Sequence, residues 1–386
     1  MTPLPPLPLP DGIRARLVTG VNGLAMHVLE AGDDGAARPL VLLLHGFPEL
    51  AYSWRRVMPA LAAAGSYAVA PDQRGYGRTT GWDADYDGDL HSSHLFNLVR
   101  DALALVAALG RRRVQAVVGH DFGSIVAAWC ALIRPDVFRS VVLMSAPFGG
   151  APSLPFGTTG PGQTPPSSTP ATSLDQQLAA LPQPRRHYQR YYATREADAN
   201  MRLCRQGLHD FLRAYYHVKS ADWPHNAPQP LAAMNATELA KLPRYYVMDA
   251  GLGMAETVAT EMPTAAQIAA CSWLPEAELA VYAGEFARTG FQGGLQWYRS
   301  LGEPGHVAQL KLFAGRRIEV PSGFIAGRQD WGIYQRPGAF EAMQRSACAD
   351  LRGCHLVPGA GHWVQQEQAL VVSGLLLEFL GRAAGS

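Results

Sequence analysis

Cysteine, net charge and long apolar runs are all scarce in this sequence of 386 residues. The five cysteines are odd in number and widely spaced, which argues against a disulfide framework and favours a cytoplasmic protein. A formal net charge of +1 disfavours nucleic acid or an anionic membrane surface as a partner. No apolar run is long enough to cross a bilayer, so we expect no membrane-spanning segment.

Two further patterns have little functional content. The N-terminal sequence MTPLPPLPLPDG lacks a basic segment and is interrupted by prolines, so we expect an extended arm rather than a signal peptide. Cys348 and Cys354 lie near His355 and His362, but their spacing does not match a usual zinc site. We therefore expect no metal.

The hydrophobic content of 48% is enough for a large core, and the order of the elements predicts an α/β fold. Strands are expected at 13–19, 24–30, 40–44, 67–70, 114–118, 141–144, 319–326 and 353–357. Helices are expected at 51–64, 93–109, 125–133, 337–347 and 366–381. Residues 148–172 are rich in Gly, Pro, Ser and Thr, whereas 175–315 have a helical pattern without strand alternation. We expect core segments at 1–147 and 317–386, separated by an inserted helical lid at 148–316 that begins with the excursion 148–172.

The most informative segment is Gly119-His120-Asp121-Phe122-Gly123-Ser124. It lies between a short apolar run and a helical pattern, which predicts a strand, a tight turn and a helix. The small residues at 119 and 123 allow the backbone to crowd a strained residue between them. Asp121 holds the position of a nucleophile at a helix N-terminus, where the helix dipole favours its ionised form. A carboxylate nucleophile forms an ester with a carbon atom that it attacks.

The segment His45-Gly46-Phe47-Pro48 directly follows another predicted strand. A loop at this place can donate one backbone N–H to an oxyanion hole, and the residue after the nucleophile donates the other. The candidate donors are therefore the amides of Phe47 and Phe122. The bond between Phe47 and Pro48 is a candidate cis peptide.

A nucleophile of this kind needs a base, and the base needs an acid that orients it. His362 lies in the small-residue loop Gly359-Ala360-Gly361-His362-Trp363, after the last predicted strand. Asp330 follows the strand that ends at residue 326. The chain order nucleophile, acid, histidine is the order found in hydrolases whose nucleophile lies on such a strand–turn–helix.

A carboxylate nucleophile disfavours ordinary esterases and favours enzymes that open epoxides or displace halide. Epoxide opening also requires a proton donor for the departing oxygen, and a phenol is a suitable acid. Tyr298 lies in the segment 294–299 and Tyr188 in the segment 187–192, both within the predicted lid. Composition alone favours a packing role for any single tyrosine.

The chain resembles the α/β-hydrolase-fold epoxide hydrolases. The segments that carry the resemblance are HGFPE at 45–49, PDQRGYGRT at 71–79, GHDFGS at 119–124, LQWYR at 295–299, GRQDWG at 327–332 and GHW at 361–363. The resemblance implies a mostly parallel eight-stranded sheet with an inserted helical lid, and a nucleophile at Asp121 with a charge relay of His362 and Asp330. It also implies two lid tyrosines that hold the epoxide oxygen. Tyr298 is one of them, and Tyr188 is the expected second, with Tyr191 and Tyr192 as alternatives.

The expected reaction converts an epoxide and water to a vicinal diol through an ester on Asp121, without a cofactor. The expected partner is a small-molecule epoxide, and the sequence leaves open whether the chain forms a homodimer. One alternative is a haloalkane dehalogenase, although Phe122 replaces the tryptophan with which those enzymes hold halide. The other alternative is a non-catalytic binding protein with the same fold. The long stretch 217–290 exceeds what is expected of the family, so the shape of the substrate pocket does not carry over.

Overall fold

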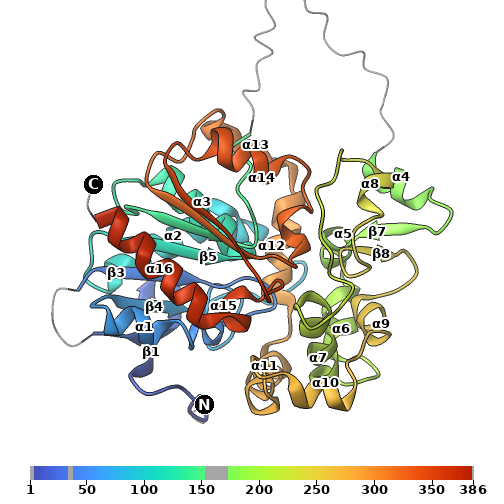
Figure 1. Cartoon of the computed structure of the whole chain (residues 1–386), viewed down its shortest axis with the longest axis horizontal. Coiled ribbons are helices and arrows are strands. Elements are labelled where there is room, and N and C mark those ends of the chain that lie inside the picture. Colours follow the sequence, from blue (N-terminus) through green and yellow to red (C-terminus); the bar gives the residue numbers. More distant parts are fainter. Residues whose placement is uncertain (1–3, 34–37, 153–172, 385–386) are drawn as a thin grey trace, which may run out of the picture.

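The computed structural model describes residues 4–33, 38–152 and 173–384 (Figure 1). Its centre is an eight-stranded sheet in the order β1-β2-β4-β3-β5-β6-β9-β10. The strands are β1 (Ile13–Val21), β2 (Leu24–Ala31), β3 (Leu40–Leu44), β4 (Tyr67–Pro71), β5 (Ala116–His120), β6 (Val141–Met144), β9 (Ser322–Gly327) and β10 (Leu351–Val357). Strand β2 is antiparallel to both of its neighbours, β1 and β4, and the other pairs are parallel. The prediction of a mostly parallel eight-stranded sheet is therefore confirmed.

Helices cover both faces of this sheet, and alternate residues of the central strands pack against each layer. In β3, Leu42 and Leu44 belong to the cluster that includes α2 (Leu95–Ala108) and α3 (Phe122–Ile133). Val41 and Leu43 belong to the cluster that includes α1 (Met58–Ala63) and α16 (Ala369–Ala384). Because successive side chains of a strand point to opposite faces, the unbroken run Leu40–Leu44 is what a strand buried on both faces requires.

Several predicted helices are divided in the structure. The expected helix 51–64 consists of a 3₁₀ turn, Ala51–Trp54, and α1, which has Pro59 in its first turn. The expected helix 93–109 begins only at Leu95, because the extended residue His94 caps α2 and separates it from the 3₁₀ turn Leu90–Ser93. The expected helix 337–347 consists of α14 (Ala339–Ala342) and a π-helical turn, Met343–Ala347. The last expected helix is preceded by α15 (Val364–Glu367).

Between β6 and β9 the chain forms a mainly helical group beside the sheet (Figure 1). Its helices are α4 (Leu174–Ala179), α5 (Tyr188–Tyr192), α6 (Glu196–Arg202), α7 (Leu208–Lys219), α8 (Ala236–Leu239), α9 (Met254–Ala259), α10 (Ala265–Ala270) and α11 (Glu276–Thr289). Two more, α12 (Gln292–Gly302) and α13 (Pro304–Leu310), return to the sheet, where α12 contacts α2. Of the predicted excursion 148–172, residues 153–172 lie outside the described residues.

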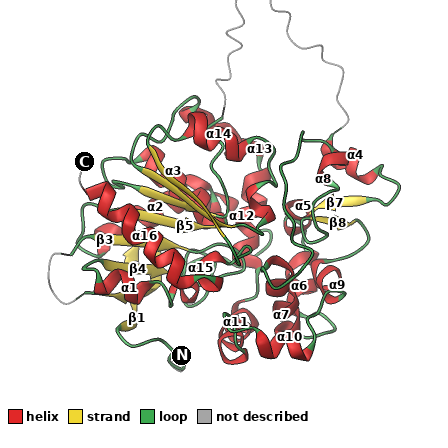
Figure 2. Cartoon of the chain, in the orientation of Figure 1, coloured by secondary structure: helices red, strands yellow, loops and turns green. Residues whose placement is uncertain are grey.

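The expectation that this region lacks strands is wrong. Strand β7 (Arg185–His187) pairs antiparallel with β8 (Val247–Asp249), and Figure 2 shows this short pair among the helices. Each strand has only three residues, which is too short for an alternating pattern to be visible in the sequence. The pair fixes the start of α5, because the Tyr188 amide donates to the carbonyl of Tyr246, one residue before β8.

Candidate active site

Asp121 lies at the sharp turn between β5 and α3, as the sequence predicts. Its backbone angles are φ 52° and ψ −119°, a strained conformation for a residue with a side chain. A Cβ atom at Gly119 would lie 2.1 Å from the carbonyl oxygen of Gly123, and one at Gly123 would lie 2.3 Å from that of Leu44. Only glycine fits at either position, so the two glycines are what allow the turn to project Asp121 from the sheet.

One oxygen of the Asp121 carboxylate is held by the loop after β3. The Phe47 amide donates to Oδ1 at 3.0 Å, and the bond between Phe47 and Pro48 is cis, as expected. A Cβ at Gly46 would lie 2.5 Å from the same Oδ1, so this loop also requires glycine. The Phe122 amide makes no hydrogen bond to the carboxylate within the described part of the chain. Its role as a second oxyanion donor stays a prediction.

His362 and Asp330 lie together with Asp121, although the three belong to different loops. His362 Nδ1 is 3.1 Å from Oδ1 and 3.2 Å from Oδ2 of Asp330, and its Nε2 is 3.3 Å from Oδ2 of Asp121. Asp330 is fixed in turn by the Gly332 amide, which donates to its Oδ1 at 2.7 Å. All three side chains are buried. The chain order predicted for a charge relay thus brings the three groups within contact of one another, while their roles stay predictions.

The charges of this cluster are mutually dependent. Burial acts to raise the pKa of Asp121, but the hydrogen bond and charge of His362 outweigh it and hold the pKa well below its ordinary value. Burial acts to lower the pKa of His362, but the charge of Asp330 raises it above the ordinary value. The arrangement therefore favours an ionised carboxylate beside a histidine that is a stronger base than usual.

A buried pair that the sequence did not reveal supports the histidine loop. His120, next to the nucleophile, has Nδ1 at 2.5 Å from Glu49 Oε2 and Nε2 at 2.7 Å from the carbonyl oxygen of His362. Glu49 also accepts from the Gly46 amide and from the side chain of Gln365. Glu49 thereby links the loop of Phe47 to the loop of His362. Its only sequence signal is its place at the end of the HGFPE segment.

The two predicted tyrosines reach this cluster from the inserted region. Tyr298 lies on α12, and its ring is 5.3 Å from that of Phe122 and 5.5 Å from that of Phe47. Tyr188 begins α5, with its ring 6.0 Å from that of Tyr298. Burial, and then the charge of the Asp121 carboxylate, raise the pKa of both phenols well above the ordinary value. Both phenols are therefore expected to keep their proton. The Tyr188 hydroxyl donates to Gln335 Oε1 at 3.2 Å and accepts from the Gln189 side chain at 3.2 Å.

The alternatives Tyr191 and Tyr192 have different surroundings. The Tyr191 hydroxyl donates to Asn200 on α6, away from Asp121. The ring of Tyr192 is 5.1 Å from that of Tyr298, but its hydroxyl donates to Tyr215 at 3.0 Å. Tyr188 is the member of this group whose phenol is affected by the Asp121 charge, and it therefore remains the expected partner of Tyr298.

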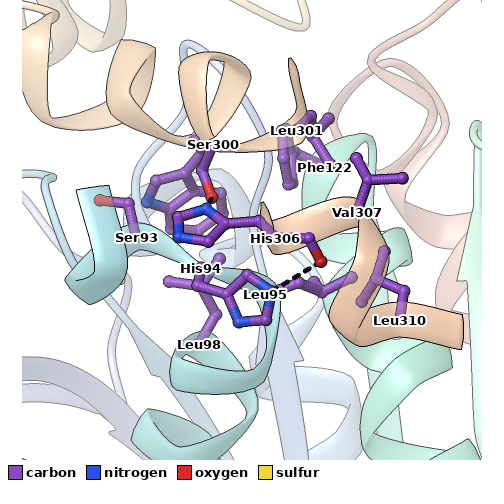
Figure 3. Close-up of a pocket in the computed structure, with 11 residues that line it drawn as sticks. Ser93, His94, Leu95, Leu98, Phe122, Ser300, Leu301, His306, Val307 and Leu310 are labelled. Atoms are coloured by element: carbon purple, nitrogen blue, oxygen red, sulfur yellow. Dashed lines mark hydrogen bonds between the residues drawn. The ribbon is translucent and has the colours of Figure 1, made fainter. Parts of the chain in front are cut away.

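A small, mainly apolar pocket borders the same site on another side of Phe122 (Figure 3). Its lining comes from the end of the 3₁₀ turn Leu90–Ser93, the start of α2 and α3, and from α12 and α13. The hydroxyl and imidazole groups in it are those of Ser93, His94, Ser300 and His306. His94 Nε2 lies 3.2 Å from the carbonyl oxygen of His306, the contact that Figure 3 marks with a dashed line. Phe122 lines this pocket and also packs on Tyr298, so its side chain borders both the pocket and the candidate active site.

The described residues contain no group of three or more histidine, cysteine, aspartate or glutamate side chains that could hold a metal ion. Within the same residues, every helix is too short or too polar to span a membrane.

Known proteins match this chain over almost its whole length. A family model of the alpha/beta hydrolase fold matches residues 39–369. Epoxide hydrolase B of Mycobacterium tuberculosis (strain ATCC 25618 / H37Rv) is 32% identical over 375 residues, which cover 94% of this chain and 97% of that protein. Epoxide hydrolase A of the same strain is 33% identical over 372 residues, with 96% and 98% covered.

Solved structures show the same relationship. An epoxide hydrolase from an endophytic Streptomyces superimposes with a TM-score of 0.75 at 31% identity, and the match covers 98% of both chains. Epoxide Hydrolase A from Mycobacterium thermoresistibile gives a TM-score of 0.72 at 30% identity, over 95% of this chain and 98% of that one. The chain is therefore a hydrolase that belongs to the α/β-hydrolase-fold epoxide hydrolases.

Proposed function

We propose that the enzyme adds water to an epoxide in two steps, through an ester between the substrate and Asp121. The observation that supports this most strongly is the unequal environment of the two carboxylate oxygens. Oδ1 accepts the Phe47 amide, whereas Oδ2 lies 3.3 Å from His362 Nε2. We infer that Oδ2 attacks the epoxide carbon and that Oδ1 remains as the carbonyl oxygen of the ester.

In the first step, the new bond from Oδ2 to carbon forms as the carbon–oxygen bond of the epoxide breaks. The leaving oxygen takes a proton from the hydroxyl of Tyr298 or Tyr188. Burial, and then the charge of Asp121, raise the pKa of both phenols, so both keep the proton that this step requires. The region 148–316 would then act as a lid, because it contributes both phenols to a site built on the sheet.

In the second step, His362 removes a proton from water while the water oxygen bonds to the ester carbon of Asp121. The tetrahedral oxyanion at Oδ1 is stabilised by the Phe47 amide and, in this proposal, by the Phe122 amide. The ester bond then breaks, and the diol oxygen takes the proton from His362. The carboxyl proton left on Asp121 restores the phenol, so that atoms and charges balance. Asp330 holds the imidazole in position and stabilises its charged form.

The proposal is tested by trapping the ester. His362→Gln should still form the ester but hydrolyse it slowly, so intact-mass spectrometry with a panel of aryl and alkyl epoxides should show an adduct that peptide mapping places on Asp121. The matched control is His355→Gln in β10, which should turn over without an adduct. In wild-type enzyme, a single turnover in oxygen-18 water should label Asp121 and leave the diol unlabelled.

Other results would redirect the assignment. An adduct from alkyl halides but none from epoxides would identify a haloalkane dehalogenase. No adduct and no turnover with either class would favour a binding protein without this activity. Label in the first diol rather than in Asp121 would exclude the ester and require direct attack by water.

A further inference from the structure

Lys219 is a buried cation whose backbone carbonyl accepts the N–H of His362, and no step of the proposed mechanism uses its ammonium group. The sequence has only three lysines, and this one is the last residue of α7, with 3% of its surface exposed. Its ammonium lies 4.9 to 5.9 Å from the centres of four aromatic rings, namely Tyr215, Tyr245, Tyr246 and Trp363. It forms no ion pair with any carboxylate of the described residues. Buried ammonium groups are costly to desolvate, and cation–π contacts compensate for only part of that cost.

The hydrogen bonds around Lys219 contain more donors than acceptors. Lys219 Nζ donates to the Tyr215 hydroxyl at 3.3 Å, and the Tyr192 hydroxyl donates to the same oxygen at 3.0 Å. Tyr215 is 1% exposed, and its oxygen already accepts two hydrogen bonds, so its own proton must point elsewhere. Within the described residues, no acceptor takes that proton or the remaining N–H groups of Lys219. Buried donors are normally paired, so this cluster is suited to an acceptor supplied by a ligand.

Both residues are connected to the proposed catalytic groups. The carbonyl oxygen of Lys219 accepts the backbone N–H of His362 at 2.8 Å. The ring of Tyr192, whose hydroxyl contacts Tyr215, lies 5.3 Å from that of Tyr188 and 5.1 Å from that of Tyr298. The unpaired donors therefore connect through one side chain, Tyr192, to the phenols proposed to hold the epoxide.

An effect of the Lys219 charge on the catalytic groups is consistent with this position. After the larger effects of burial and His362, the ammonium contributes to lowering the pKa of Asp121. It also acts to lower the pKa of His362, against the larger and opposite effect of Asp330. Because the Lys219 charge affects Asp121, we infer that one substrate can place its epoxide at Asp121 and a second group at Lys219.

We propose that Lys219 and Tyr215 form a subsite for an anionic oxygen, so that the preferred substrates are epoxides whose substituent carries a carboxylate. The inference rests on the proposed function, because the subsite has a purpose only if an epoxide occupies the adjoining site. A carboxylate accepts several hydrogen bonds and neutralises the ammonium, whereas a neutral ester or ether leaves the charge uncompensated. The aromatic rings around Lys219 exclude water and strengthen the interaction.

The test compares matched acids and esters. The probes are terminal epoxides of straight-chain alkanoic acids of increasing length, each paired with its methyl ester, and the readout is the ratio of kcat/KM for acid to that for ester. Wild-type enzyme should prefer the acid at one or more chain lengths. Lys219→Met should lower the ratio at that length by at least about tenfold, and Tyr215→Phe should lower it by less. The control Lys241→Met removes an exposed lysine paired with Glu238 and should leave the ratio unchanged.

The ratio separates the two proposals. No turnover of the acids, the esters or the aryl and alkyl epoxides by wild-type enzyme would refute epoxide hydrolysis itself. Turnover of the aryl and alkyl epoxides but of neither acids nor esters would refute the subsite alone. Turnover with a preference for the ester at every length, or a ratio that Lys219→Met leaves within twofold of wild type, would refute the subsite alone. Calorimetry on wild-type enzyme keeps the question answerable even if Lys219→Met does not fold. The diol product should bind more tightly as the acid than as the methyl ester, and equal binding would overturn the subsite.

Discussion

Gly123→Ala should damage both stability and activity, because the first turn of α3 has no space for a methyl group. A Cβ there would lie 2.3 Å from the carbonyl oxygen of Leu44 and 2.5 Å from that of His45. Ordinary contacts begin at 3.4 Å, so the backbone must move by about 1 Å. Overpacking of this kind costs about 1–3 kcal/mol or more, which outweighs the gain of about 1 kcal/mol from replacing glycine by alanine in a helix. We expect a melting temperature several degrees below wild type.

The same shift should impair catalysis, since the displaced backbone leads directly to Phe47, whose amide holds Asp121 Oδ1. Loss of one oxyanion donor costs about 10²–10³ in kcat. The control is Gly374→Ala in α16, where a Cβ meets no atom within 4 Å. It should raise stability by about 0.5–1 kcal/mol and leave kcat unchanged. Thermal unfolding and steady-state kinetics measure both effects. If Gly123→Ala had the melting temperature and the kcat of the wild-type enzyme, the close-packing argument would be wrong.

Three further outcomes follow from the charges of the site. Asp330→Asn removes the charge that raises the pKa of His362, so the acidic limb of ester hydrolysis in a single-turnover pH profile should move to lower pH, with kcat reduced by up to about 10⁴. Burial acts to raise the pKa of Asp330, but the charge of His362 and the hydrogen bonds outweigh it and lower this pKa on folding. The ionised carboxylate therefore stabilises the protein above the unfolded pKa of about 3.9. Urea unfolding should therefore show a wild-type advantage over Asp330→Asn that shrinks as the pH falls below that value. Tyr298→Phe should slow ester formation by about 10²–10⁴, whereas Tyr191→Phe should not, as rapid-quench measurements would show.

The central sheet and the turn at Asp121 could be predicted because their determinants are local. Five consecutive apolar residues at 40–44 identify a strand buried on both faces, and Gly119 and Gly123 identify a turn that excludes side chains. The proximity of Asp330 and His362 followed from topology. Loops at the carboxyl ends of parallel strands meet at one edge of the sheet, whatever their distance in sequence.

The inserted region was less predictable because its structure depends on contacts between distant segments. The pairing of β7 with β8 joins residues about sixty positions apart, and neither strand has a visible pattern alone. The choice among the tyrosines at 188, 191 and 192 had the same difficulty. All three are buried on one short helix. They differ in their hydroxyl partners and in whether the charge of Asp121 affects their pKa, and neither can be read from the sequence.

The sequence did not predict the burial of two charged side chains, those of Lys219 and Glu49, for a related reason. The two differ in how neighbouring groups compensate their charges. Lysine at the end of a helix usually complements the helix dipole in solvent, so α7 alone predicts an exposed Lys219. Glu49 is buried too, but His120, the Gly46 amide and Gln365 all donate to it. Because the Glu49 carboxylate has hydrogen-bond donors within the protein, its burial is explained by its role in holding two loops together. Among the residues that the structure describes, Lys219 has one acceptor for three N–H groups, and natural proteins leave such imbalances mainly where function requires them. The deficit of acceptors, rather than burial alone, is therefore what marks Lys219 as a residue for a ligand.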